Sequence, residues 1–457
     1  MKGGVLCIRD MKALSLVGHV IELYDRVRSL ELPTDAVVSK FVRRRKYLGS
    51  KDRRFITDAL FGIVRHRKRL EAILEHSLKQ MHFVAPAVQF PALWMYVAYA
   101  VCIRNQPQTD ALKDLSSLWM TSSPDVDLER LLALLNEHAR LDFLPQFPAL
   151  RLATEHSYPT WMVEQWLRRL GEEETHRLCI AMNEVAPVAI RVNTTKASVE
   201  ECRAALEKEG VKCHPSSLSP FGLIFEKRID IHVLRAFRAG LFEIQDEGSQ
   251  ILSLLVNPRP GQFIVDACAG GGGKALHLSA LMENGGQIVA LDVDQRRLEE
   301  LRRRCHRVNA ANVEPVLVDA HDGSAEESYV AMADAVLVDA PCSGSGTIRR
   351  NPGTKWILTQ RKIEEYQLRQ RYILTRYSRL VKPGGRLVYA TCSLLEEENE
   401  AVIQEFLEKQ SSFRLQPVRE VLEQWDLHHL TEMGYLFLFP HRHSTDGFFA
   451  AVLERNP

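Results

Sequence analysis

The sequence lacks the cysteine patterns of disulfide-rich and zinc-binding proteins. Nine cysteines are scattered through 457 residues, and none of them forms a CxxC pair or joins histidines at zinc-ligand spacing. Disulfide frameworks and structural zinc sites depend on such regular spacing, whereas an odd, dispersed set is typical of reduced thiols. The cysteines therefore favour a cytoplasmic protein that holds no structural metal.

Long hydrophobic runs are also absent. The most apolar stretch, residues 90–103, is much shorter than the roughly 20 residues that a membrane-spanning helix needs. The amino terminus, MKGGVLCIRD, lacks the apolar core of a secretory signal. We therefore expect no membrane association, and we expect residues 90–103 to form a buried core helix.

The chain has no strong overall charge, because 59 Lys and Arg residues balance 58 Asp and Glu residues. Basic residues are nonetheless concentrated in residues 40–54, which contain eight Lys or Arg and the single acid Asp52. A one-signed segment with interleaved aromatic residues suits contacts to phosphates, although a solvated helix face has the same composition. The candidate RNA-binding residues are Arg43, Arg44, Arg45, Lys46, Lys51, Arg53 and Arg54.

Periodicity divides the chain into three parts. Residues 10–150 carry apolar residues at three- and four-residue steps, which predicts an α-helical bundle. Residues 151–240 contain a strand-like segment, 188–192, and a Ser-x-x-Glu capping box at 198–201, which indicates a small α+β module. Residues 241–457 alternate strand and helix patterns, which predicts a Rossmann-like α/β domain with a mostly parallel, seven-stranded sheet.

The seven strands of this sheet are predicted at 262–267, 287–292, 313–318, 334–339, 386–391, 435–439 and 447–454. Helices are predicted between them, near 273–283, 294–309, 360–381 and 396–410. The last two strands lie close together in the sequence, which permits an antiparallel pair at one edge of the sheet.

A glycine-rich turn follows the first of these strands and opens a helix. Such a turn brings the backbone close to a ligand and directs helix N–H groups toward it. It has neither the GxxxxGK[ST] pattern of a phosphate-binding loop nor a clean GxGxxG, and a plain flexible turn has the same composition. The candidate cofactor-binding residues are Cys268, Ala269, Gly270, Gly271, Gly272, Gly273 and Lys274.

Acidic residues end the strands that follow. Asp292 lies about 20 residues past the loop, where a carboxylate is placed for two ribose hydroxyls. Asp319 ends the third strand and is placed for an adenine amino group, and Asp339 ends the fourth. These residues predict an adenosine cofactor, although any one of them could cap a helix instead. Because no phosphate-binding device is present, S-adenosylmethionine fits better than NAD.

Two cysteines, Cys342 in DAPCSG and Cys392 in TCS, each follow a strand-like run. Side chains just past the carboxyl ends of strands in an open α/β sheet point into the ligand crevice. Two thiols there, one of them beside Asp339, suit covalent catalysis in which one sulfur attacks and the other assists release. Two alternatives to an enzyme that uses both thiols stay open. One is a DNA cytosine methyltransferase that attacks with Cys342, and the other is a non-catalytic RNA-binding protein.

The segments DACAGGGGK, ALDVD, LVDAPCSGSGTIRRNP and LVYATCSLLEEENE together resemble RNA 5-methylcytosine methyltransferases of the RsmB/NSUN type. The resemblance covers essentially residues 185–457. The helical region before it looks like the NusB-like RNA-binding domain of bacterial members that modify small-subunit ribosomal RNA. The resemblance thus implies a NusB-like RNA-binding domain over 10–150, an RNA-binding or linker module over 151–240, and a methyltransferase domain over 241–457.

The resemblance also implies roles for individual residues. S-adenosylmethionine would bind at Cys268–Lys274, Asp292, Asp319 and Asp339. Cys392 would be the nucleophile and Cys342 the releasing thiol, while protonated Asp339 would hydrogen-bond the cytosine ring. The expected protein is a cytoplasmic monomer that acts on RNA, with ribosomal RNA as its expected substrate.

The chain departs from the family pattern in the glycine-rich loop. The family usually has proline at the position of Gly271, and this chain has four consecutive glycines instead. Additional glycine raises the entropy cost of ordering the loop. We therefore expect a cofactor site that is less pre-organised but still active.

Overall fold

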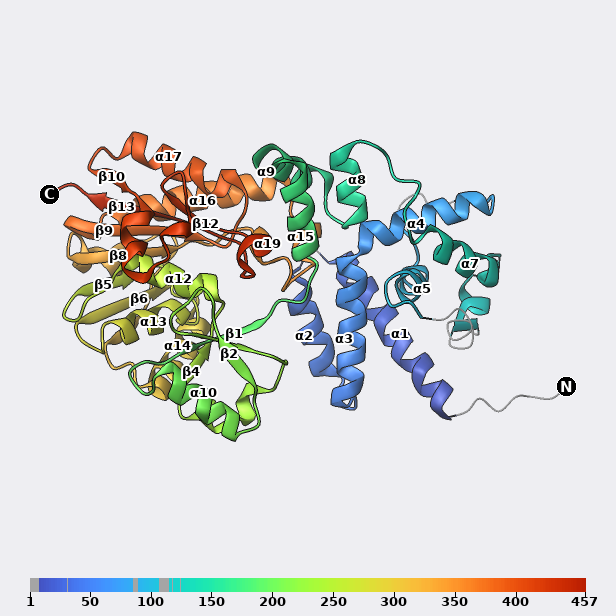
Figure 1. Ribbon diagram of the computed structural model, residues 1–457, viewed down its shortest axis with the longest axis horizontal. Helices are drawn as coiled ribbons and strands as arrows, with labels where there is room; N and C mark the ends of the chain where they lie inside the picture. The colour runs from blue at the N-terminus through green and yellow to red at the C-terminus, as the bar shows by residue number, and fades with distance from the viewer. Residues whose placement is uncertain (1–7, 31, 85–88, 107–114, 117, 124) are drawn as a thin grey trace. The chain divides into compact units, whose positions relative to one another are not determined.

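The computed structural model describes residues 8–30, 32–84, 89–106, 115–116, 118–123 and 125–457. The chain divides into two compact units, and most of their helices and strands are labelled in Figure 1. The first unit comprises Met1–Glu184 together with Arg350–Ile357. The second comprises Val185–Arg349 and Leu358–Pro457.

The described part of the first unit is helical, which confirms the predicted helical region. Its α-helices are α1 (Ile8–Ser29), α2 (Thr34–Arg44), α3 (Ser50–Arg65), α4 (Arg67–Gln80), α5 (Ala92–Cys102), α7 (Leu128–His138), α8 (Pro148–Glu155), α9 (Thr160–Ala181) and α15 (Thr354–Ile357). Helical structure therefore continues beyond residue 150, as far as Ala181.

Helix α5 forms the centre of the first unit. All of its residues, Ala92–Cys102, are buried, as expected for a helix that is apolar on every side. Helix α3 approaches it closely at Gly62, where an added Cβ would lie 2.2 Å from the Tyr99 hydroxyl oxygen. The prediction of a buried core helix in residues 90–103 is confirmed. No helix in the described residues is both long and apolar enough to span a membrane.

A short segment from late in the sequence completes the first unit. Lys355 in this segment is fully buried, and its Nζ donates to the backbone oxygen of Arg65 at 2.9 Å. The same Nζ lies 4.0 Å from the ring centroid of Tyr158. Trp356 donates its indole N–H to the backbone oxygen of Val64 at 2.7 Å. These contacts attach Arg350–Ile357 to the end of α3.

The second unit begins with a small antiparallel sheet of order β2-β3-β1-β4. Its strands are β1 (Val188–Val192), β2 (Cys213–Pro215), β3 (Gly222–Phe225) and β4 (Phe242–Ile244), and its helices are α10 (Val199–Lys208) and α11 (Arg235–Arg238). The predicted capping box starts α10: Ser198 Oγ accepts from Glu201 N at 3.1 Å, and the Glu201 carboxylate accepts from Ser198 N at 2.8 Å.

The remainder of the second unit is built on a large sheet of order β11-β12-β13-β9-β8-β5-β6-β7, with β10 paired to β13. Its strands are β5 (Phe263–Asp266), β6 (Gln287–Asp292), β7 (Val313–Leu317), β8 (Ala333–Asp339), β9 (Val381–Thr391), β10 (Phe413–Gln416), β11 (Thr431–Glu432), β12 (Tyr435–Leu438) and β13 (Phe448–Arg455). Strands β9, β8, β5, β6 and β7 are parallel, whereas β10, β11, β12 and β13 pair antiparallel. The predicted Rossmann-like fold is confirmed.

The count of seven strands was wrong, because the described residues form nine strands in this sheet. Strands β10 and β11 were missed because they are only four and two residues long, and alternation over so few residues does not identify a strand. Helix α12 (Glu247–Val256) was also not predicted, and it packs on the sheet face that includes Leu337 and Val388. The other helices of this domain are α13 (Gly273–Leu281), α14 (Gln295–Val308), α16 (Gln360–Ser378), α17 (Glu400–Lys409), α18 (Val418–Leu422) and α19 (Pro440–His443).

The strand order reverses beside β5, the first strand of the parallel set. The chain proceeds from β5 to β6 and β7 on one side, and then returns to β8 and β9 on the other. The carboxyl ends of β5, β6, β8 and β9 therefore surround a topological switch point, which is where open α/β sheets bind ligands.

Two partly buried histidines in the first unit predict that it is destabilised by acid. Burial, followed by the charge of Lys355, lowers the pKa of His66 to about 3. Burial, followed by His176, lowers the pKa of His156 to about 4. Unfolding returns each pKa to about 6.5, so the unfolded state binds more protons between about pH 6.5 and 4. Stability is fully present above this window and is lost as the pH falls through it.

Urea unfolding of the full chain at pH 7.5 and pH 5.0 measures this effect. His156→Gln is expected to lose less stability at pH 5.0 than the wild type does, because one of the protonation sites is gone. His82→Asn, a change at an exposed histidine of the same unit, is the control and is expected to behave as wild type. Equal losses in all three proteins would contradict the assignment.

Candidate active site

A pocket of about 960 Å³ lies at the carboxyl ends of the central parallel strands. It is lined by the glycine-rich loop, both candidate cysteines and side chains of α16. The predicted site residues that line it are Cys268, Ala269, Gly270, Gly271, Gly273, Lys274, Asp292, Asp339, Cys342 and Cys392. Two predicted residues, Gly272 and Asp319, are not part of its wall.

The glycine-rich loop needs glycine for two different reasons. Gly270 and Gly272 have φ angles of +54° and +83°, in the left-handed region that disfavours other residues. At Gly272 an added Cβ would also lie 2.1 Å from Leu301 Cδ1. Gly272 therefore allows the loop to pack against α14, and its neighbours present their backbone to the pocket.

Asp292 holds the loop in place from the end of β6. One carboxylate oxygen accepts from Gly270 N at 2.7 Å, and the other accepts from Asp294 N at 2.8 Å. Each carboxylate oxygen has a second lone pair. Asp292 therefore fixes the loop and keeps lone pairs for ribose hydroxyls, and its contact with ribose stays a prediction.

Asp319 has a different position from the one expected. Its side chain is exposed and accepts from the backbone N–H groups of His321 at 2.8 Å and Asp322 at 3.0 Å. These hydrogen bonds lower the pKa of Asp319 below its ordinary value. The pocket wall beside it is formed instead by Val318 and Ala320. The carboxylate thus caps a turn, which is neither the ligand contact nor the helix cap that the sequence analysis considered.

Asp266, at the end of β5, is a site residue that the sequence analysis did not select. It is 1% exposed, it lines the pocket, and both of its carboxylate oxygens lack a hydrogen-bond partner among the described residues. Burial raises the pKa of Asp266 to about 7, although Lys274 opposes the shift. An unpartnered buried carboxylate requires a cation or a donor. The ammonium group of S-adenosylmethionine has this chemistry, so the residues present fit that cofactor.

Lys274 and Asp339 form an ion pair in the pocket wall, with 2.5 Å between Nζ and Oδ2. Burial disfavours the charge of Lys274, but the Asp339 carboxylate outweighs it and raises the pKa of Lys274. The acid at the end of β8 therefore has an ammonium partner. Strand β8 and the helix that follows the glycine-rich loop are joined by this pair.

The two candidate cysteines lie side by side although 50 positions separate them. Their sulfur atoms are 3.4 Å apart, well beyond the roughly 2.05 Å of a disulfide, and both thiols are free. The hydrogen bond with Cys392, followed by burial, raises the pKa of Cys342 well above its ordinary value. A raised pKa favours the protonated form of the Cys342 thiol.

A buried carboxylate, Glu398, joins the loops that carry these cysteines. Its oxygens accept from Ser343 N at 2.8 Å, from Ser343 Oγ and from Ser393 Oγ. Gln370 of α16 donates to it at 2.9 Å and to the backbone oxygen of Pro341 at 3.0 Å. Ser343 and Ser393 directly follow Cys342 and Cys392 in the sequence. Glu398 thus connects the residues next to both thiols.

The sequence signal for Glu398 was present but ambiguous. It is the third of three consecutive glutamates, and the first of them, Glu396, is exposed. Asn399 assists it by accepting from Thr391 Oγ1 at 2.6 Å and donating to the backbone oxygen of Ser393 at 3.0 Å. Composition alone does not reveal which acid of such a run turns inward.

A buried arginine draws three separate sequence segments together behind the cysteine loops. Arg349 Nε donates to Asp446 Oδ1 at 2.5 Å, and its Nη2 lies 3.7 Å from Asp246 Oδ2. Gly346 N donates to the backbone oxygen of Cys392 at 2.9 Å, which links the two loops directly. An added Cβ at Gly346 would lie 2.2 Å from the oxygen of Gly447. Glycine is therefore required at this crossing.

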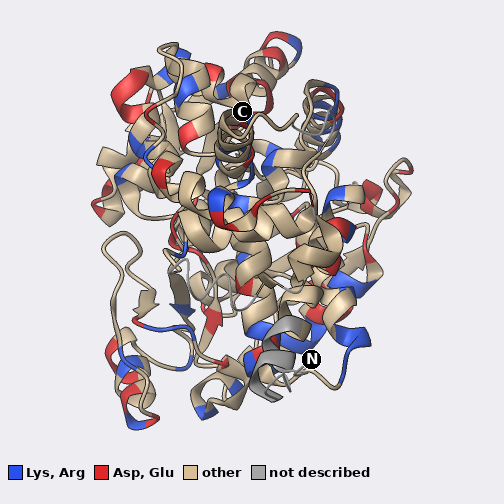
Figure 2. Ribbon diagram, turned by 90° about the vertical axis from the view of Figure 1, so that its right-hand side faces the viewer, with Lys and Arg blue, Asp and Glu red and all other residues tan. Residues whose placement is uncertain are grey.

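The candidate RNA-binding residues lie on α2, α3 and the turn between them. Of these, the exposed ones are Arg43, Arg44, Lys46, Lys51 and Arg54, and the partly buried ones are Arg45 and Arg53. Arg45 lies 3.6 Å from the ring centroid of Phe41 and 2.6 Å from Glu22. It therefore serves helix packing. Figure 2 shows that basic and acidic segments are otherwise interspersed along the chain.

The described residues contain one cluster of side chains that could bind a metal ion. It consists of Glu155, His156 and His176, whose potential ligand atoms lie within 4.8 Å of one another. The charges of Arg69, Lys355 and Arg151 also act on His156. Because these cations would repel a metal ion, we assign no metal to the group.

The fold and the pocket together define a class of protein. A doubly wound sheet with an adenosine-type site, an unpartnered acid facing that site and no phosphate-binding loop describes an S-adenosylmethionine-dependent methyltransferase.

Comparison with known proteins identifies the family. The family model for the 16S rRNA methyltransferase RsmB/F matches residues 253–454, and the model for a ferredoxin-like domain of RsmF/B-like methyltransferases matches residues 158–232. The chain is 30% identical to a probable ribosomal RNA small subunit methyltransferase B from Synechocystis, over 92% of this chain and 95% of that protein. A probable enzyme of the same name from Bacillus subtilis is 27% identical, over 91% and 93%.

One solved structure is similar over almost the whole chain. The structure of PH0851 is 29% identical and covers 97% of this chain and 99% of that protein, with a TM-score of 0.72. The chain therefore belongs to the RsmB/F family of methyltransferases and uses S-adenosylmethionine as its cofactor. The family resemblance stated from the sequence is confirmed.

Replacement of Glu398 tests whether it aligns the two thiols. Glu398→Gln removes acceptors for two serine hydroxyls in a buried site, where each unsatisfied donor costs about 1–3 kcal/mol. We expect the rate of methyl transfer to fall by about 10²-fold, as misplacement of reacting groups by about 1 Å does. The rate under saturating cofactor and RNA is the measurement. Glu396→Gln, an exposed neighbour, is the matched control, and an equal effect of both changes would refute the role.

Proposed function

We propose that the protein methylates carbon 5 of a cytosine in small-subunit ribosomal RNA through a covalent bond between Cys392 and carbon 6 of the base. The observation that carries this proposal is the pair of free thiols 3.4 Å apart in the wall of the cofactor pocket. A methyl transfer that needs no covalent adduct has no use for a second thiol. The names of the relatives support ribosomal RNA as the substrate.

The two cysteines have different roles in the proposed reaction: one attacks the base and the other assists its release. Carbon 5 of cytosine is a poor nucleophile until a thiolate adds to carbon 6 and makes the ring an enamine. The family resemblance makes Cys392 the attacking sulfur, and the raised pKa of Cys342 favours a protonated thiol at the second position. S-adenosylmethionine, when bound, supplies the methyl group. Water then takes the carbon-5 proton and the bond between carbon 6 and the Cys392 sulfur breaks, while the Cys342 thiol assists by donating its proton to the departing thiolate.

The Lys274–Asp339 pair supplies hydrogen bonding to the cytosine ring. The sequence suggested a protonated Asp339 as the donor to the ring nitrogen. In the structure Asp339 Oδ2 lies 2.5 Å from Lys274 Nζ, so the ammonium group is the proton donor of this pair. A donor at this nitrogen stabilises the negative charge that the thiolate brings to the ring.

The target base must leave its stack to reach thiols that are recessed in a pocket. Single-stranded or loop RNA therefore suits this site better than a duplex does. The exposed part of the basic cluster on α2 and α3 is our candidate for contacts to RNA phosphates. Assignment of residues 10–150, 151–240 and 241–457 to RNA-binding, linker and catalytic roles stays a prediction, as does a monomeric state.

Trapping of the adduct tests the proposed mechanism. With unmodified ribosomal RNA and S-adenosylmethionine, Cys342→Ala is expected to accumulate an RNA–protein adduct on a denaturing gel, because release is impaired. Cys392→Ala is expected to form neither adduct nor product. Analysis of digested product RNA for 5-methylcytosine identifies the methylated atom.

Other outcomes would favour the alternatives. An inactive Cys342→Ala without an adduct, combined with an active Cys392→Ala, would make Cys342 the nucleophile, as in DNA cytosine methyltransferases. RNA binding without any methyl transfer by the wild type would favour a non-catalytic RNA-binding protein.

The salt dependence of RNA binding tests the basic cluster. Replacement of Arg43, Arg44 and Lys46 by alanine is expected to weaken binding and to reduce the slope of log K against log salt, because each lost phosphate contact lowers it by about 0.7–0.9. Arg45→Ala is the matched control and is expected to lower thermal stability with little change of slope. An unchanged slope in the triple variant would show that the cluster is a solvated surface.

A further inference from the structure

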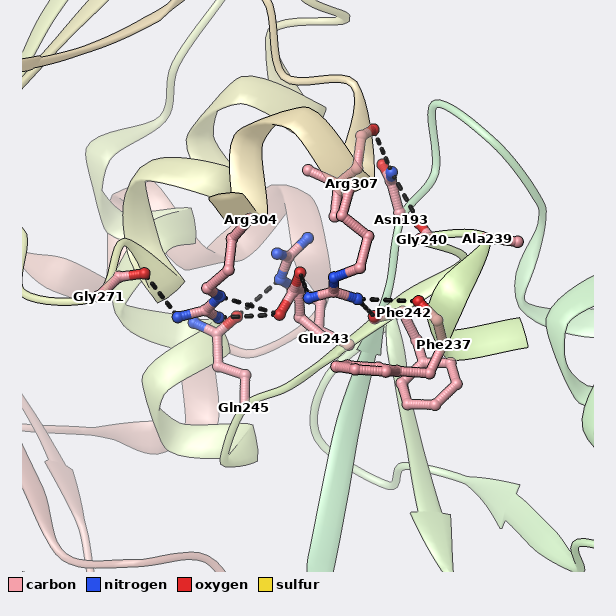
Figure 3. Close-up of polar contacts among 12 residues, drawn as sticks. Asn193, Phe237, Ala239, Gly240, Phe242, Glu243, Gln245, Gly271, Arg304 and Arg307 are labelled. Atoms are coloured by element: carbon pink, nitrogen blue, oxygen red, sulfur yellow. Dashed lines mark hydrogen bonds and ion pairs between the residues drawn. The ribbon is translucent and has the colours of Figure 1, made fainter. Parts of the chain in front are cut away.

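A buried carboxylate of the small sheet is paired with two arginines of the large domain. Glu243 of β4 has a side chain that is 3% exposed, and it lies between Arg304 and Arg307 of α14 (Figure 3). Arg304 donates to Glu243 Oε2 through Nη2 at 2.9 Å and Nε at 3.2 Å. Arg307 donates to Glu243 Oε1 through Nη2 at 2.5 Å. A single carboxylate therefore orients both guanidinium groups.

Arg304 also reaches the glycine-rich loop. Its Nη1 donates to the backbone oxygen of Gly271 at 2.6 Å (Figure 3). Gly271 lines the cofactor pocket. Glycine leaves the backbone free to adopt many conformations, and a hydrogen bond from a fixed side chain restricts it.

The arginine is positioned by contacts that do not involve the loop. Arg307, which shares Glu243 with it, lies 3.9 Å from the ring centroid of Phe237 and donates to the Phe237 backbone oxygen at 3.0 Å. Asn193 donates to the backbone oxygens of Gly240 at 3.1 Å and Val308 at 3.0 Å. The end of α14 is thus attached to the small sheet at several points, and the Arg304 guanidinium is fixed before any cofactor arrives.

We propose that Glu243 and Arg304 are positioning residues for S-adenosylmethionine, through which the small sheet orders the glycine-rich loop. Neither side chain is in the pocket wall, so their effect on the cofactor passes through the Gly271 carbonyl. The proposal rests on the cofactor assignment and not on which base is methylated.

The first experiment measures S-adenosylmethionine binding by calorimetry and the steady-state constants of the full chain. Arg304→Ala is expected to raise Kd and the KM for S-adenosylmethionine by about 10-fold, with kcat within twofold of the wild type. Arg303→Ala is the matched control, because Arg303 is an exposed residue of the same helix whose ion-pair partner is Glu300 at 3.3 Å. A Kd for Arg304→Ala within twofold of the wild type would overturn the proposal.

A second variant separates loop ordering from general stability. An added Cβ at Gly271 would lie 3.2 Å from Arg304 Nη1, so removal of the arginine clears space for it, and Gly271 does not have a positive φ. Gly271→Ala in the Arg304→Ala background restricts the loop without the hydrogen bond. It is expected to recover at least threefold of the lost affinity.

One outcome of the double-variant experiment would refute the positioning role of Arg304. If Gly271→Ala leaves the affinity of the Arg304→Ala protein unimproved, Arg304 supports only the general fold and the positioning role is refuted. Failure to find 5-methylcytosine in the product would disprove the proposed function but would not change these binding constants, so the two failures are distinguishable.

Discussion

The hydrogen bonds of Glu398 are the interaction on which the arrangement of the active site depends. The two cysteine loops follow β8 and β9, which are adjacent parallel strands, so their carboxyl ends are close. Adjacency of strands alone does not bring two sulfurs to 3.4 Å. A buried carboxylate that accepts from the residues after both cysteines supplies the remaining constraint. A buried charge is tolerated when its acceptor sites are filled, and Ser343, Ser393 and Gln370 fill them.

The same principle recurs around the pocket. Glu243 is buried between two arginines, Arg349 is buried against Asp446, and the partly buried Lys274 pairs with the partly buried Asp339. Each pair connects segments that are distant in sequence and adjoin the site. Asp266 is the exception, because its buried oxygens have no partner among the described residues. The paired charges connect the segments around the pocket. The Asp266 carboxylate instead faces the cofactor pocket, where a bound ligand can donate hydrogen bonds to it.

Sequence patterns predicted the elements of this site better than their roles. The strands that end at Asp292 and Asp339 agree closely with those observed, since alternating strand and helix patterns are strong local signals. Asp319 shows the limit, because an acid at a strand end can cap a turn as well as bind a ligand. Arg45 shows it again, since a basic residue in a cationic run is here paired with Glu22 and Phe41. Composition does not distinguish a solvated charge from one that packs.

Local sequence therefore determined the fold class, the glycine-rich loop and the two cysteine motifs, because periodicity, glycine and short motifs act over a few residues. The tertiary structure alone decided which charges meet. Glu398 reaches Ser343 across 55 positions, and Arg304 reaches Glu243 across 61. Such pairs depend on the order of strands in the sheet and on burial, which no local pattern encodes. The sequence placed the thiols at the edge of the sheet, and long-range packing of buried charges set the distance between them.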